Sequence, residues 1–198
     1  MRVPPVLALL ATSFCFSPPP LAATLVPEVG FETLVADSEA IVHGTVVRSW
    51  TAWDEGHAAI WTHYEVRVAS WLKGSPASTI RISEPGGSVG GVHTQIVGAP
   101  RYAVGEEIVV FAHRTPIGYL RTSGWSQGKF VVSAGGSGSG NASGKIVSSV
   151  RTGAQIVSAA QPVKTPLSSL DRSDLAQFLA RVRAEVARGG SQNGGGLR

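Results

Sequence analysis

The sequence predicts a mainly β domain: a small, closed or nearly closed β-barrel with a short helix before it and an amphipathic helix after it. Residues 62–74 place two sets of side chains on alternate faces, which is typical of a strand with one face on a core. Residues 40–50 are rich in β-forming side chains around Gly44, and a glycine inside a strand indicates the bulge or bend that a barrel needs. Residues 168–188 repeat apolar side chains at helical spacing.

The first 23 residues have the composition of a secretory signal peptide. Arg2 supplies a positive charge, residues 6–16 form an uncharged apolar core, and Ala23 is a small residue at the expected cleavage position. The apolar core is shorter than the run of about 20 residues that a membrane-spanning helix needs. We therefore expect residues 1–23 to be a signal peptide, with no stable membrane insertion after cleavage. A retained membrane anchor is the alternative.

Composition limits the remaining chain to a few classes. Removal of the signal peptide also removes Cys15, the only cysteine, and the rest is long enough to bury a core without disulfides. We expect one barrel domain over residues 24–165. The formal net charge is +4, and the positive residues are dispersed. Since nucleic-acid-binding domains concentrate basic residues in a stripe, we expect no nucleic-acid partner.

The barrel domain is expected to begin with a short helix over residues 31–38, where apolar residues recur at helical spacing. Residues 40–50 and 60–72 then predict a hairpin across an Asp-Glu-Gly turn. The apolar and β-branched segments that follow predict further strands at residues 79–83, 92–97, 108–112, 119–122 and 129–132.

A Gly/Ser tract predicts a flexible loop over residues 133–145. Two weak strands after it, 145–150 and 154–157, are expected to pair with each other. Residues 166–189 then predict the C-terminal helix, and residues 190–198 predict a disordered tail.

The C-terminal helix has signals for both of its ends. Ser168 and Asp171 have the spacing of a capping box, and Gly189 with Gly190 predicts the helix end. Its apolar residues are expected to pack on the barrel as one stripe: Leu170, Leu175, Phe178, Leu179, Val182 and Val186.

Several of these segments, in this order, resemble the netrin-like module, an OB-type barrel shared with the tissue inhibitors of metalloproteinases. Ala36-Asp37 before the first long strand is similar to that family's acidic lead into its first strand. Residues 64–74, which end in Trp-Leu-Lys-Gly, resemble its second strand, and residues 80–82 and 105–111 resemble its third and fourth. Over residues 31–133 the chain also resembles secreted bacterial proteins built on the same order of segments.

This resemblance implies an OB-like (netrin-like) fold and a secreted or periplasmic location in a bacterium. The animal inhibitors reach the zinc of a protease through an N-terminal cysteine inside a disulfide framework. This chain has no cysteine after residue 23, so those inhibitory residues do not carry over to it. What remains is the expectation of an inhibitor-like or protease-associated protein.

Motifs for catalysis and metal binding are weak. Zinc sites need three or four converging ligands, and the weak candidates are His57 and His63, which are expected to face each other across the predicted hairpin. Residues 136–140 read Gly-x-Ser-x-Gly, but in low-complexity sequence and not on a strand-to-helix turn. We expect no catalytic residue, no cofactor and no enzyme activity. A metal-dependent hydrolase that uses the histidines is an alternative.

Aromatic residues gather on the predicted hairpin and suggest a binding surface. Aromatic side chains are favoured at interfaces, although packing against the core is the alternative. We expect a non-catalytic binding module with a secreted protein or protease as partner. A structural protein of the cell envelope, recruited through Arg181, Arg183 and Arg188, is a further alternative. The candidate partner surface adds two glycines of a Gly-rich loop to the tryptophans: Trp50, Trp53, Trp61, Trp71, Gly87 and Gly90.

Overall fold

The computed structural model describes residues 25–135, 144–150, 152–157 and 163–193. The predicted signal peptide, the middle of the Gly/Ser loop and the last five residues of the chain lie outside the described residues. Among the described residues, no helix is both long and apolar enough to cross a lipid bilayer.

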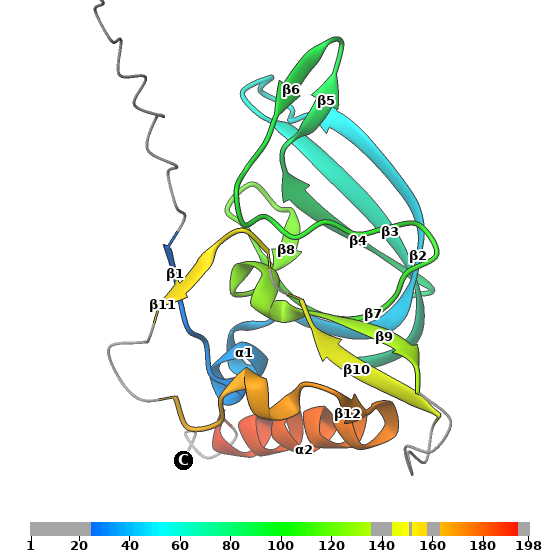
Figure 1. The fold of residues 1–198 in the computed structure, drawn as a ribbon, viewed down its shortest axis with the longest axis vertical. Helices are drawn as coiled ribbons and strands as arrows, with labels where there is room; N and C mark the ends of the chain where they lie inside the picture. Colours follow the sequence, from blue (N-terminus) through cyan, green and yellow to red (C-terminus); the bar gives the residue numbers. More distant parts are fainter. Residues whose placement is uncertain (1–24, 136–143, 151, 158–162, 194–198) are drawn as a thin grey trace, which may run out of the picture.

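The predicted mainly β domain with two helices is confirmed (Figure 1). In the main sheet the spatial order is β12-β10-β9-β7-β2-β3-β4, and β8 pairs with β7 beside this path. Two short ribbons stand apart from it. The strands of the main sheet are β2 (Ala40–Trp53), β3 (Ile60–Lys73), β4 (Thr79–Pro85), β7 (Glu107–Arg114), β8 (Leu120–Thr122), β9 (Lys129–Ala134), β10 (Lys145–Ser149) and β12 (Ser173–Asp174).

The two ribbons and the helices complete the fold. In one ribbon β1 (Leu25–Pro27) runs parallel to β11 (Gln155–Val157), and in the other β5 (Gly87–Val89) pairs with β6 (Val92–Thr94). The helical elements are α1 (Phe31–Asp37), the 3-10 helices η1 (Trp125–Gly128) and η2 (Leu167–Leu170), and α2 (Leu175–Asn193).

The hairpin of β2 and β3 contains bulges that decide which side chains share a face. Val46 pairs with Val66 but Arg48 pairs with Glu65, so Val47 is an extra residue in β2. Further along, β3 has an extra residue at Ala69. Each extra residue reverses the alternation of faces beyond it.

Gly44 is required for the close approach of these two strands. A Cβ on Gly44 would lie 2.3 Å from the carbonyl oxygen of Arg67. The register also breaks between His43 and Gly44. The irregularity predicted at Gly44 is therefore confirmed, but its extra residue, Ala69, lies in the partner strand β3.

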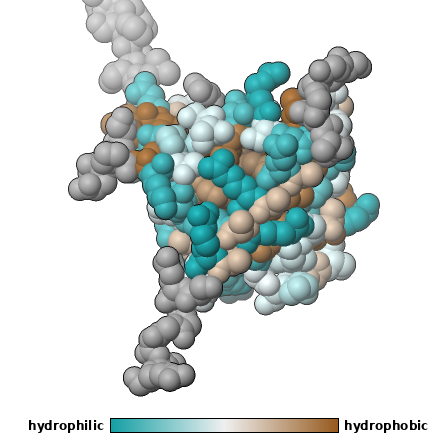
Figure 2. All heavy atoms as spheres, turned by 90° about the horizontal axis from the view of Figure 1, so that it is seen from below, coloured by the Kyte–Doolittle hydropathy of each residue, from teal (hydrophilic) through white to brown (hydrophobic). Residues whose placement is uncertain are grey.

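Apolar side chains form two clusters on opposite faces of the sheet. The helices cover one face, and the first cluster joins their apolar residues to β7 and β9 (Figure 1). The second cluster lies inside the curve formed by β7, β2, β3 and β4. Viewed from below, the solvent side of the helical layer is largely hydrophilic (Figure 2). The first cluster contains, among others, Phe31, Leu34, Val35, Phe111, Phe130, Leu175, Phe178, Leu179 and Val182.

The end of β3 is bound to the first helix. Nζ of Lys73 donates hydrogen bonds to the carbonyl oxygens of Val35 and Ala36, at 2.7 and 2.9 Å. A cation at this position satisfies carbonyl groups that a helix leaves free at its C-terminus. Gly74 follows with φ +102°, a conformation that favours glycine. The Lys-Gly pair therefore ends the strand and caps α1.

The curved sheet is not closed into a barrel by strand pairing. Among the described strands β4 pairs with β3 alone and β8 with β7 alone, although β4 and β8 lie side by side. Glu84 of β4 bridges this seam, since its Oε1 accepts hydrogen bonds from the backbone N–H and the hydroxyl of Thr122 at 2.7 and 2.6 Å. Hydrogen bonds to one side chain thus join β4 to β8, where a closed barrel would have backbone hydrogen bonds between paired strands.

The predicted pairing of residues 145–150 with 154–157 is wrong. β10 pairs with β9 and β12, and β11 pairs with β1. Val147 of β10 is buried in the first cluster, whereas all three residues of β11 are exposed. Because β11 has no buried face, nothing holds it in the main sheet.

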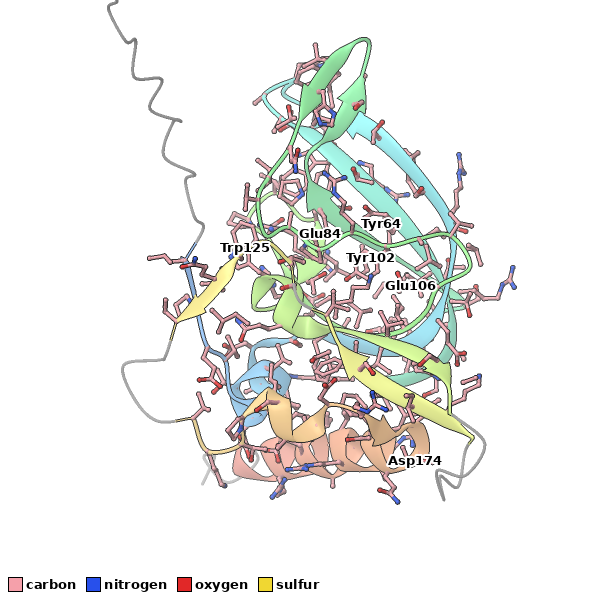
Figure 3. The ribbon with its side chains drawn as sticks, viewed as in Figure 1. Tyr64, Glu84, Tyr102, Glu106, Trp125 and Asp174 are labelled. Carbon is pink, nitrogen blue, oxygen red and sulfur yellow. The ribbon has the colours of Figure 1, made fainter. Side chains whose placement is uncertain are left out.

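The predicted bounds of the C-terminal helix are also corrected. The cap is Asp174, whose Oδ1 accepts a hydrogen bond from the backbone N–H of Gln177 at 3.1 Å (Figure 3). Asp171 instead accepts hydrogen bonds from Ser149 of β10. The helix continues through Gly189 and Gly190 to Asn193, so residues 190–193 are helical and not a disordered tail. Glycine lowers helix propensity by about 1 kcal/mol but does not prevent a helix.

Candidate functional site

The outer face of β2, β3 and β4 carries a cluster of arginine and aromatic side chains. Residues directly opposite in an antiparallel sheet share a face. Arg48, Glu65 and Arg81 form one such row across the three strands. The next row contains Trp50 and His63. We call the following residues the arginine–aromatic face: Arg48, Trp50, His63, Glu65, Arg67 and Arg81.

Trp50 is the centre of the arginine–aromatic face. The guanidinium carbons of Arg48 and Arg81 lie 4.9 and 5.4 Å from the centroid of its ring. The ring of His63 lies 5.3 Å away, centroid to centroid. An exposed cation–π contact contributes about 0.5–1 kcal/mol, enough to bias the positions of two long arginine side chains.

The arginines of this face are free to bind a partner. Arg48, Arg67 and Arg81 are exposed, and none of them makes a hydrogen bond or ion pair with another described residue. Glu65 is in register with Arg48 and Arg81, yet it forms no ion pair with either. Arg114 pairs with Glu39, and the contacts of the helix arginines are described below. Arg101 and Arg172 are exposed and also lack a side-chain hydrogen bond or ion pair to the described residues, so what distinguishes Arg48 and Arg81 is their stacking on Trp50.

His63 is a buried part of this face. Its Nδ1 is 2.8 Å from Oγ of Ser83, and the ring of Tyr119 packs edge-on at 5.4 Å. Burial, and secondly the charge of Arg81, lower the pKa of His63 below its ordinary value. The imidazole is therefore neutral at neutral pH. Since Ser83 is only 1% exposed, the Ser–His pair packs the face and offers no accessible nucleophile.

Trp61 lies two residues from His63 on the same side of β3, but it is covered there and does not reach the surface. It is 8% exposed, and its ring packs edge-on against Tyr119 at 5.1 Å. Arg121 lies between Trp61 and Trp125, at 5.9 and 5.3 Å from the two ring centroids. Trp125 has φ +58°, which is uncommon for a bulky residue. Its backbone is therefore strained at the position where its ring contacts Arg121.

The other two predicted tryptophans lie apart from the arginine–aromatic face. Trp53 is near the hairpin turn and stacks on His57 at 6.3 Å. Trp71 lies at the far end of β3, where its Nε1 donates a hydrogen bond to the carbonyl oxygen of Ala77 at 2.7 Å. The extra residue Ala69 turns Trp71 toward the second apolar cluster. The structure therefore does not bring the four tryptophans together, and Trp50 alone contributes to the face.

The two glycines of the predicted surface have separate roles. Gly87 is buried, and a Cβ there would lie 2.7 Å from Cγ2 of Thr51 and 2.8 Å from Oγ1 of Thr62. It allows β5 to pack on the β2–β3 hairpin. Gly90 is exposed at the turn of the β5–β6 ribbon, with φ +57°. Of the two, only Gly90 is at the surface, and it belongs to the β5–β6 ribbon, which is not paired with the sheet that carries Trp50.

The two candidate metal ligands have different neighbours. His57 is exposed in the hairpin turn against Trp53, whereas His63 is buried against Ser83, Trp50 and Tyr119. In the part of the chain that the structure describes, no three His, Cys, Asp or Glu residues converge as metal ligands. The hydrolase alternative therefore has no metal centre among these residues.

The helix arginines proposed for the envelope alternative are engaged with the chain itself. Arg181 lies over the ring of Phe31, 5.5 Å from its centroid. Arg183 donates a hydrogen bond to Ser70 at 3.3 Å, and Arg188 pairs with Glu185. The donors of Arg183 and Arg188 are therefore less available than those of the arginine–aromatic face, whereas Arg181, like Arg48 and Arg81, makes only a cation–π contact.

A buried polar network fills the inside of the curved sheet, where Figure 3 shows Tyr64, Glu84, Tyr102 and Glu106 gathered. Glu84 is 2% exposed, and burial raises its pKa to about 6 despite the hydrogen bonds from Thr122 and the nearby Arg121. The Thr122 hydroxyl donates to Glu84, so Tyr102 donates to Thr122 across 2.5 Å. These hydrogen bonds hold the loop that precedes β7, which contains Tyr102, inside the curved sheet.

Lys129 extends this network on the far side of Tyr102. Its Nζ lies 4.5 Å from the centroid of the Tyr102 ring and 2.8 Å from Oε2 of Glu106. It also donates to the carbonyl oxygen of Arg101 at 2.6 Å. Sequence reasoning missed Glu84. The sequence does contain a signal for it: Ile80 and Ile82 face inward, and Glu84, two residues further along the same strand, must face the same way.

A groove of about 430 Å³ lies between η1, β11 and η2. The polar side chains that line it include Gln127, Ser149 and Thr152. Each of these is hydrogen-bonded to other groups of the chain. The groove therefore offers less unsatisfied binding capacity than the arginine–aromatic face.

Comparison with protein-family models and with curated proteins finds no match for this chain. The netrin-like resemblance stays a prediction, and inferences about function rest on the geometry above.

Proposed function

We propose that this protein is a secreted or periplasmic, non-catalytic binding module, and that it binds another secreted protein through the arginine–aromatic face. A secreted protease is the first partner to consider. The observation that carries the proposal is the set of exposed, unpaired arginines held around Trp50 on adjacent strands. Arginine and tryptophan are enriched among the residues that dominate protein–protein binding energy.

Two properties of the face favour a protein partner over a uniform polyanion. Glu65 lies between Arg48 and Arg81, so a continuous negative chain would meet a like charge at the centre. The side chains stand on paired β-strands, so less conformational entropy is lost when a partner binds. A mixed, rigid surface of this kind suits a partner with mixed charges.

The netrin-like resemblance supports an inhibitor-like role but changes its mechanism. The animal inhibitors use an N-terminal cysteine on the protease zinc, and this chain has no cysteine after residue 23. Any inhibition would therefore arise from the sheet face covering the partner. The partner's zinc would keep its own ligands.

The test begins with the whole protein, exported from a bacterial host with its own N-terminus and a C-terminal tag. It is mixed with exported proteins of the source organism, and retained proteins are identified by mass spectrometry. We expect one stoichiometric partner that Arg81→Glu fails to retain. Arg183→Glu, an exposed arginine on α2, is the matched control and should retain it.

The identified partner is then purified and titrated with this protein, and any protease activity is measured with and without it. Direct binding that depends on Arg81 supports the proposal. Equal binding by wild type and Arg81→Glu, or turnover of the partner by this protein, would contradict it.

A further inference from the structure

We infer that the arginine–aromatic face receives an acidic segment of its protein partner, with carboxylates on Arg48 and Arg81 and a hydrogen-bond donor on Glu65 between them. This inference rests on the proposed function, because it names the chemistry of the partner at the same surface.

The spacing of the row suits an extended segment. Arg48 and Arg81 lie on the two strands that flank β3, both in register with Glu65. Neighbouring strands are about 4.8 Å apart, so the two arginine Cα atoms are about 10 Å apart. Side chains on one face of an extended chain repeat about every 7 Å, so two acids that flank a central donor are about 14 Å apart at Cα, and bending of the long glutamate and arginine side chains makes up the difference.

The chemistry of the row suits carboxylates. A guanidinium presents parallel N–H groups that bind one carboxylate through two hydrogen bonds. Arg48 and Arg81 are already stacked on Trp50, and their donors make no hydrogen bond to any residue that the structure describes. Stacking restricts both side chains before binding, so less freedom is lost when the carboxylates arrive.

The charge of the face sets the order of groups in the segment. His63 is neutral at neutral pH, so the arginines and Glu65 alone determine the charge pattern: positive, negative, positive across the row. The complement is an acidic residue, a donor such as lysine or serine, and a second acidic residue. Arg67, two residues along β3, can take a further carboxylate.

The experiment uses the whole protein and a fluorescent peptide, Glu-Ser-Lys-Ser-Glu, at low ionic strength, with fluorescence anisotropy as the readout. We expect binding that weakens about tenfold or more when both glutamates become glutamine. Arg48→Gln and Arg81→Gln should each weaken it by a similar factor. Arg81→Lys keeps the charge but loses the paired donors, so its affinity should fall between wild type and Arg81→Gln.

Two further variants make the test specific. Arg183→Gln on α2 should leave peptide binding unchanged. Glu65→Gln should weaken the peptide with central lysine and strengthen a peptide of five glutamates. Equal binding of the Glu and Gln peptides, or a loss with Arg183→Gln equal to that with Arg81→Gln, would overturn the inference.

The outcome separates this inference from the proposed function. If the acidic peptide does not bind while Arg81→Glu still abolishes binding of the natural partner, the acidic segment is wrong and the proposed function stands. If the acidic peptide does not bind and Arg81→Glu also leaves binding of the natural partner unchanged, the inference and the proposed function are both wrong. If heparin binds through the same arginines and the peptide does not, the face recognises a polyanion and the inference is overturned.

Discussion

Glu84 and Thr122 are joined across the open seam of the sheet by two short hydrogen bonds, from the Thr122 backbone N–H at 2.7 Å and from its hydroxyl at 2.6 Å. No ladder joins β4 to β8 among the described residues, so these bonds and the Arg121 guanidinium at 3.4 Å hold the seam. The carboxylate is thus a structural group whose protonation state affects the whole curved sheet.

The seam makes stability depend on pH. Burial raises the pKa of Glu84 from 4.5 to about 6, so the folded state binds a proton more tightly than the unfolded chain. The stabilisation is complete below pH 4.5 and is lost as the pH rises through about 6. At about 1.4 kcal/mol per pKa unit, the free energy of unfolding should fall by about 2 kcal/mol across this window, relative to Glu84→Gln.

Urea unfolding of wild type and Glu84→Gln, measured from pH about 4.5 to about 7, checks this prediction. Glu65→Gln removes a carboxylate from the outer face and should retain the wild-type fall. Parallel profiles for wild type and Glu84→Gln would show that Glu84 does not produce the pH dependence.

Gly44→Ala should be strongly destabilising. The new Cβ would lie 2.3 Å from a backbone oxygen of β3, which cannot move without separating the strands. We expect a loss of about 2–3 kcal/mol in the free energy of unfolding, measured by urea titration. Gly105→Ala is not a clean control because its φ is +89°, whereas Gly56→Ala, in the exposed hairpin turn, should have a much smaller effect.

Gly189→Ala should stabilise the protein. Gly189 is helical and exposed, and a Cβ there meets no atom within 4 Å. Alanine has the higher helix propensity, so we expect a gain of about 0.5 kcal/mol in the free energy of unfolding and an increase in helical circular dichroism. A loss of stability would instead indicate that the helix ends at this glycine, as its sequence predicts.

Trp61→Ala and Trp50→Ala should separate packing from binding. Trp61 is 8% exposed, and its loss should cost about 3–5 kcal/mol of unfolding free energy. Trp50 is half-buried at the surface, so its loss should cost about 1 kcal/mol but release Arg48 and Arg81. Thermal unfolding and partner binding, measured on both variants, test this. A folded Trp50→Ala variant with full affinity would exclude Trp50 from the site.

The sequence predicts the strands, the helices and most of the core, because these depend on local periodicity. Phe31, Leu34 and Val35 recur at helical spacing and are buried. The stripe predicted for the last helix packs on the first cluster, although its Leu170 belongs to η2 and not to α2. Non-local pairing is harder to predict. β11 joins β1, more than a hundred residues away, through backbone bonds that no side-chain pattern marks.

The candidate site was only partly predictable, because bulges decide its faces. The sequence correctly predicts Trp50 as a surface residue, but strand alternation predicts the wrong face for Trp71 because the extra residue Ala69 has no signature in the sequence. Arg48 and Arg81 are 33 positions apart, and their shared stacking on Trp50 depends on the register of three strands. Contacts of this kind follow from register, not from composition.

Val47 has a consequence for how this surface can diverge among related chains. Its insertion in β2 places Arg48 and Trp50 on the opposite face from Val46. A relative without this residue would run Val46 directly into the arginine, and ordinary alternation would still place the arginine and tryptophan on the outer face. A relative that keeps the residue but pairs without the bulge would instead turn both toward the interior. A one-residue gap here in an alignment is therefore compatible with an unchanged binding surface, whereas loss of the bulge alone is not.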